Sequence, residues 1–102
     1  MKPGVIRIDT VVQCLEVWLD ATFPFAKMKV KVVDRGKSDY LAVTNLLFRE
    51  GNGETDSEAG MGSTPQEAIE DLLSRFVANA NERRPSSGFQ ESDFEWSSHE
   101  DF

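Results

Sequence analysis

The sequence predicts an α+β fold, a two-layer sandwich in the order α-β-β-β-α with a three-stranded antiparallel sheet and a disordered acidic C-terminal tail. Three observations predict it: a well-marked helix at residues 64–80, an alternating segment at residues 25–33, and a change of composition after residue 84. A small antiparallel sheet of this kind buries one apolar face under helices and leaves the other in water. We therefore expect one domain over residues 1–84 and a flexible tail over residues 85–102.

The helix at residues 64–80 has a start signal and an apolar stripe. Thr64 is placed to cap it, Pro65 occupies the first helical position, and Glu67 completes a capping box. Apolar residues then recur at spacings of three and four, which places them on one face. We expect this face to pack on the sheet together with apolar residues of an earlier helix; the set is Ile69, Leu72, Leu73 and Phe76, with Leu15, Trp18 and Leu19.

Residues 10–22 are expected to form that earlier helix. Thr10 begins a second candidate capping box, and the apolar residues after it share one helical face until Pro24 requires an extended residue before it. In such a helix Cys14 is buried and inert. A strand is the alternative for this segment, because valines, which are β-branched, stand at positions 11, 12 and 17.

Residues 25–33 alternate between apolar and lysine side chains, which is typical of a half-buried strand. A turn signal at residues 34–39 then leads into a second, antiparallel strand at residues 40–49. Residues 57–62 supply a short third strand before the helix. Between the last two strands lies an acidic loop with two glycines, at residues 50–56.

The composition limits the compartment and the class of partner. The formal net charge is −7, with 18 acidic and 11 basic residues, which disfavours unspecific binding to phosphates. A single cysteine forms no internal disulfide, and no apolar run approaches the roughly 20 residues that span a bilayer. The N-terminus does not resemble a signal peptide. We expect a cytoplasmic protein with no membrane partner.

The sequence contains no catalytic or metal-binding signature. Its only histidine, His99, falls in the tail, and its only cysteine, Cys14, has no evident partner. One Cys and one His do not make a closed zinc site. The acids of the loop lack the spacing of a calcium-binding loop and are interpreted as solvated; they are Glu50, Glu54, Asp56 and Glu58. We expect no enzyme, no metal and no cofactor.

The run GMGSTPQEA at residues 60–68 resembles the glycine-rich strand end and helix opening of double-stranded-RNA-binding domains, and the predicted element order is similar to theirs. The same run resembles a segment of HicB-type antitoxins, which have a partial form of that fold. The RNA-binding family places lysines at the start of this helix to hold phosphates. This chain departs from that pattern, with Gln66, Glu67, Glu70 and Asp71.

Three lysines, Lys27, Lys29 and Lys31, fall on one face of the predicted strand at residues 25–33. Their spacing is about 6.6 Å in an ordinary strand. A ladder of this kind is able to follow a phosphate backbone. The alternative interpretation is that the lysines cover an exposed sheet face and discourage pairing of edges.

The predicted tail combines acids with four large aromatic residues, which disordered segments usually lack. This composition indicates side chains that dock on a partner, with the acids steering and the rings supplying burial. The ending HEDF resembles the acidic, phenylalanine-terminated tip of bacterial single-stranded-DNA-binding proteins. The alternative is a solubilising tail. The expected partner-binding residues are Phe89, Asp93, Phe94, Glu95, Trp96, Glu100, Asp101 and Phe102.

Two functions follow from these patterns. The first is a small acidic protein-binding module without enzymatic activity, which occupies a basic or apolar-lined groove of a target protein. Small acidic proteins of this kind are similar to phage-encoded inhibitors of host defence and to antitoxins. The second is a nucleic-acid-binding module that uses the three lysines and is autoinhibited by the acidic tail.

Overall fold

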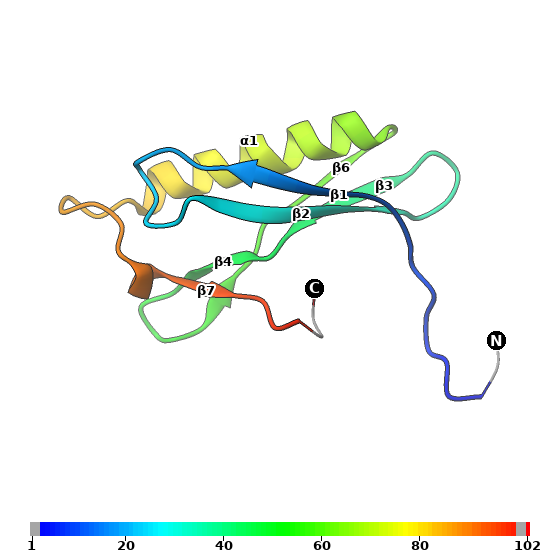
Figure 1. Cartoon of the computed structure of the whole chain (residues 1–102), viewed down its shortest axis with the longest axis horizontal. Coiled ribbons are helices and arrows are strands. Elements are labelled where there is room, and N and C mark those ends of the chain that lie inside the picture. The colour runs from blue at the N-terminus through cyan, green and yellow to red at the C-terminus, as the bar shows by residue number, and fades with distance from the viewer. Residues whose placement is uncertain (1–2, 100–101) are drawn as a thin grey trace.

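The computed structural model describes residues 3–99 and 102, and in these residues seven strands and one long helix form an α+β fold (Figure 1). The larger sheet has the order β1-β2-β3-β6, all antiparallel, with β1 at Thr10–Trp18, β2 at Lys27–Asp34, β3 at Tyr40–Thr44 and β6 at Ala59–Gly62. The smaller sheet has the order β5-β4-β7, with β5 at Thr55–Asp56, β4 at Leu46–Arg49 and β7 at Phe94–Trp96.

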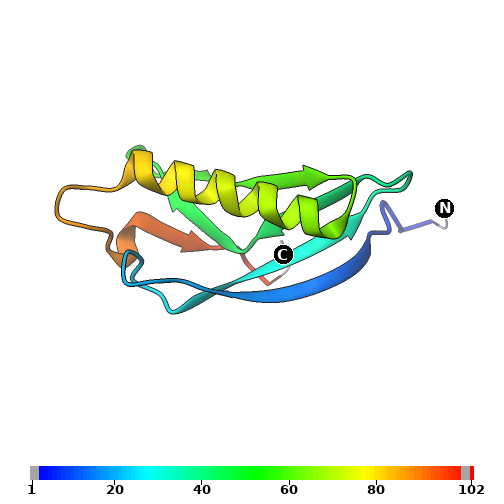
Figure 2. The same ribbon diagram turned by 90° about the horizontal axis from the view of Figure 1, so that it is seen from above.

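The helix α1 spans Pro65–Arg83 and covers one face of the larger sheet (Figures 1 and 2). The expectation of a helix here is confirmed. The hydroxyl of Thr64 accepts a hydrogen bond from the Glu67 amide at 3.1 Å, as a capping residue does. Leu72 and Phe76 are buried, and Ile69 and Leu73 are partly buried against the core.

The strand β6 approaches α1 so closely that only glycine fits at its second position. A Cβ atom on Gly60 would lie 2.2 Å from the backbone nitrogen of Leu72 and 2.4 Å from the carbonyl oxygen of Ala68. The strand expected within residues 57–62 is β6, at Ala59–Gly62. Gly60 permits the backbones of this strand and of α1 to come into contact.

Residues 10–18 form strand β1, so the expected helix over residues 10–22 is wrong and the alternative is correct. β1 pairs with β2 along its length, apart from a bulge between Val11 and Gln13. Its side chains alternate: Leu15 and Val17 pack against the core, as does Leu19 after the strand, whereas Cys14 and Trp18 are exposed. Trp18 is therefore not a core residue and Cys14 is not buried. The period of two, and not the helical period, matches the buried positions.

The expected second strand over residues 40–49 is divided at Asn45 into β3 and β4, which belong to different sheets. The amide of Asn45 donates to the Lys29 carbonyl at 3.1 Å, and its side-chain oxygen accepts from the Lys29 amide at 2.9 Å. Its own carbonyl accepts from the Ser97 amide at 2.8 Å. These bonds satisfy the backbone where the chain leaves the larger sheet.

The segment after α1 packs onto the core, so the expectation of a disordered tail is wrong for it. A short 3-10 helix at Glu91–Asp93 leads into β7, which pairs with β4. Phe94 is 3% exposed, and Phe89 packs against the same core. The Phe94 ring lies 5.0 Å from that of Phe89 and 5.4 Å from that of Phe48, between centroids. Aromatic burial holds this segment despite its negative charge.

We predict that Phe94→Ala lowers the free energy of unfolding by about 3–5 kcal/mol, because it empties a site inside a packed aromatic cluster. The measurement is chemical denaturation followed by circular dichroism. The matched control is the adjacent Glu95→Ala, which removes an exposed side chain and should leave the midpoint nearly unchanged. An unchanged midpoint for Phe94→Ala would show that the segment does not belong to the fold.

Candidate protein-binding and nucleic-acid-binding surfaces

The structure divides the expected partner-binding residues into core and surface. Phe89 and Phe94 lie in the aromatic cluster, so a partner could contact Phe94 only if β7 left the core. Trp96 is 40% exposed and packs edge-on against Phe25, with ring centroids 4.9 Å apart. Glu100 and Asp101 lie outside the residues that the structure describes.

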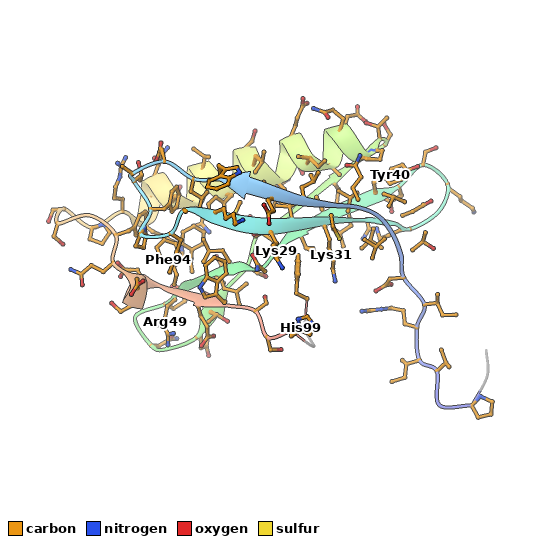
Figure 3. The ribbon with its side chains drawn as sticks, viewed as in Figure 1. Lys29, Lys31, Tyr40, Arg49, Phe94 and His99 are labelled. Carbon is orange, nitrogen blue, oxygen red and sulfur yellow. The ribbon has the colours of Figure 1, made fainter. Side chains whose placement is uncertain are left out.

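The remaining acids of this set have partners within the fold. The carboxylate of Asp93 accepts a hydrogen bond from the amide of Gln90, the N-cap of the 3-10 helix, at 2.8 Å. Glu95 is exposed and lies 3.5 Å from the guanidinium of Arg49, which is itself exposed and labelled in Figure 3. An exposed pair at this distance contributes little stability, so both charges stay accessible.

A hollow of about 610 Å³ lies beside Trp96. Its apolar lining comes from both sheets, with Val43 from β3 and Leu47 from β4. The carboxylates of Glu58 and Glu95 also border it, as do Trp96 and the C-terminal Phe102. The hollow therefore has a mixed lining, in which apolar side chains stand beside Ser and Thr hydroxyls and two carboxylates.

The three lysines project from β2 on the sheet face opposite α1, as Figure 3 shows for Lys29 and Lys31. Two of them already have partners. The ammonium of Lys27 lies 3.0 Å from Glu16 and 5.1 Å from the ring centroid of Trp18. The ammonium of Lys31 donates to the carbonyl oxygen of Phe102 and lies 4.8 Å from the centroid of its ring.

Lys29 borders a second hollow, of about 510 Å³, together with Cys14, His99 and Phe102. Ser97, Ser98 and Phe102 line this hollow and the one beside Trp96, so the C-terminal segment separates the two. The lysine face is thus partly covered by the chain's own C-terminus, through one cation–π contact and one hydrogen bond.

Three acids of residues 50–58, Glu50, Asp56 and Glu58, have partners within the fold. The guanidinium of Arg83 lies 2.7 Å from Glu50 and 2.9 Å from Asp56, and the buried Asn79 donates to Glu58 at 3.0 Å. The hydrogen bond from Arg83 lowers the pKa of the Glu50 carboxyl. These groups tie the end of α1 to the loop. Within residues 3–99 and 102 no cluster of His, Cys, Asp or Glu side chains is arranged to hold a metal ion.

One surface was not identified from the sequence: the outer edge of β1 and the segment before it. Val11, Val12 and Trp18 are exposed there, and Ile6 and Ile8 are exposed in the preceding residues. The β-branched valines of residues 10–18 favour a strand, but the helical interpretation placed Trp18 on a face packed against the sheet. The exposed apolar edge can be recognised only when residues 10–18 are assigned to a strand.

Comparison of the chain with protein-family models, with curated proteins and with solved structures finds no significant match. No helix in the part of the chain that the structure describes combines the length and apolar composition needed to cross a membrane.

Proposed function

We propose that this protein is a small acidic protein-binding module without enzymatic activity, and that Trp96 enters an apolar-lined groove on a basic surface of its partner. The observation that carries the proposal is the exposure of Trp96, at 40%, beside a hollow whose lining includes apolar side chains and the carboxylates of Glu58 and Glu95. Tryptophan in such a setting is the residue type that most often contributes a large share of binding energy.

The position of Trp96 favours binding because the side chain is already held. Its backbone lies in β7, paired with Leu46 of β4, and its ring rests on Phe25. A ring held in place before binding loses less conformational entropy than a ring in a disordered tail. The interaction therefore differs from the expected docking of a disordered tail: the surface is preorganised and the partner supplies the groove.

The charge of the module supports a basic partner. The net charge is −7, and exposed carboxylates at Glu91 and Glu95 accompany Trp96 along the same segment. Charges of one sign at the border of an interface raise the association rate with a surface of the opposite sign. A partner that binds nucleic acid presents such a surface. The proposed role is therefore that of an antitoxin-like or phage-type inhibitor, which the sequence resemblance also favours.

The test places a photo-crosslinking amino acid, p-benzoylphenylalanine, at position 96 in the cell that makes the protein. We expect one discrete protein adduct. The matched control carries the same amino acid at Val77, an exposed apolar position on α1, and should not give that adduct. The crosslinked protein is then purified and titrated into Trp18→Phe protein, in which Trp96 is the only tryptophan. Its emission should shift to the blue.

The Glu95→Lys variant should bind this purified protein more weakly, with most of the loss in the association rate at low salt. Trp18→Ala, which removes a tryptophan from a different surface, should bind as the wild type does. The proposal is wrong if positions 96 and 77 give the same adducts, or if Trp96→Ala leaves the affinity unchanged.

Nucleic-acid binding is the second candidate, and the lysine face is the observation that favours it. Lys29 borders an open hollow, and Lys31 contacts Phe102 in a way that removal of the C-terminal residues would release. On this hypothesis the segment after Trp96 blocks a phosphate-binding face. Deletion of residues 98–102 keeps β7 and the Ser97 amide that donates to Asn45, and it removes the contact of Phe102 with Lys31, so it tests the idea without disturbing these bonds.

If the lysine face binds nucleic acid, the shortened chain should gain binding to duplex RNA or to single-stranded DNA at low salt, and Lys29→Glu should abolish the gain. If the proposed protein-binding function is the whole activity, the shortened chain should bind neither. Fluorescence anisotropy with labelled oligonucleotides distinguishes these outcomes.

A further inference from the structure

The strand β1 is an open edge of the larger sheet. It has nine residues, the longest strand in the described part of the chain, and β2 is its only partner in the order β1-β2-β3-β6. In Figure 2 it lies along one long side of the molecule, in blue, away from the cover of α1. An edge of this length presents a row of unpaired backbone donors and acceptors, which is a template for a further strand.

The opposite edge of the same sheet is protected, and β1 is not protected in the same way. β6 has four residues, and the amide of Met61 donates to the carboxylate of Asp71 at 2.9 Å. That hydrogen bond is the main cause of the lowered pKa of Asp71. β1 contains no proline or lysine, and its one charged residue, Glu16, is paired with Lys27. Its bulge ends before Gln13, so the register from there to Trp18 is unbroken.

Exposed apolar side chains occur at both ends of this edge. Trp18, at the C-terminal end, is 71% exposed, and Val12, at the N-terminal end, is 41% exposed. Before the strand Ile8 is 76% exposed, in a segment that extends away from the body of the molecule (Figure 1). Isolated exposed apolar residues are ordinary, but apolar side chains at both ends of an open strand edge favour an interaction there.

Antiparallel pairing of β1 with its own copy brings these two ends together. A two-fold axis perpendicular to the sheet reverses the strand, so Trp18 of one copy approaches the N-terminal part of β1, near Val12, in the other. The contact is made twice by symmetry. Repulsion between two copies is small at this edge, because β1 carries only one charged residue, Glu16.

The side-chain alternation limits the register. Each residue has to face a residue on the same side of the joined sheet, so the axis passes through a residue position. An axis at Glu16 would place two carboxylates opposite each other, which is destabilising. An axis at Cys14 or Leu15 avoids this. In both registers the two Cys14 side chains are direct or diagonal cross-strand neighbours, roughly 5–8 Å apart.

We propose that two copies of this chain associate through antiparallel pairing of β1 about a two-fold axis at Cys14 or Leu15, which joins their larger sheets into one. The edge of β1 is a different surface from the hollow beside Trp96, so dimer formation does not depend on the proposed protein-binding function. It leaves the face opposite α1 open in both copies.

The first test measures mass by light scattering or sedimentation over a wide concentration range. The wild type should approach twice its chain mass of 11.4 kDa as concentration rises. Cys14→Glu places a carboxylate opposite Lys31, its partner in β2, so the monomer is expected to stay folded. In the dimer the same carboxylate would face Glu16 or its own copy. The variant should remain a monomer, while Val77→Glu, with the same change of charge on α1, should still dimerise.

The second test uses the single cysteine as a reporter. A short thiol-specific bifunctional reagent should link two wild-type chains through Cys14, which is exposed. The control, Cys14→Ser with Val77→Cys, should give little linked product under the same conditions. A wild type that stays monomeric at all concentrations would overturn the proposal. So would a Cys14→Glu variant that is folded and dimerises as the wild type does.

Discussion

The contact between aromatic rings of α1, the smaller sheet and the C-terminal segment is the interaction on which the rest of the structure depends. Phe48 of β4 lies at its centre, with ring centroids 5.1 Å from Phe76 of α1 and 5.4 Å from Phe94 of β7. The larger sheet has α1 as cover, but the smaller sheet has little apolar area of its own and too few residues to be stable alone. Phe94, together with Phe89, closes the cluster. The chain beyond the helix therefore completes the core, although its composition is acidic.

This packing determines which residues remain for binding. Two of the tail's four large aromatic residues are used internally, and Trp96 lies at the boundary, packed on one side and exposed on the other. The lysines of β2 lie on the face opposite α1, where Phe102 contacts Lys31. The outer edge of β1 is a third and separate surface. The fold thus has three separate surfaces: the one around Trp96, the partly covered lysine face and the open edge of β1. Substitutions in each surface test one function at a time.

The sequence predicted what short-range patterns determine and missed what depends on distant pairing. The capping residues Thr64 and Pro65 and the following stripe placed α1, and the alternating lysines placed β2. Residues 10–18 were assigned to a helix because Leu15 and Trp18 also fit a spacing of three to four; the pairing with β2 selects the period of two. The path of the chain between the two sheets depends on hydrogen bonds that join Asn45 to Lys29 and Ser97, which are distant in the sequence. β7 has only three residues, and its partner β4 lies before α1 in the sequence. No local pattern therefore predicts β7 as a strand.

Hydrogen exchange at the backbone amides tests most directly whether the C-terminal segment belongs to the core, because it reports each element separately. The Ser97 amide, which donates to the Asn45 carbonyl, and the Glu95 amide, which faces β4 in the same register, should exchange slowly, at rates close to those of β4 and of the second half of α1. The residues before β1 should exchange fast in the same experiment. The account would be contradicted if these two amides exchanged at the rate of an unstructured peptide while β4 and α1 stayed protected, because the aromatic cluster would then form without Phe94.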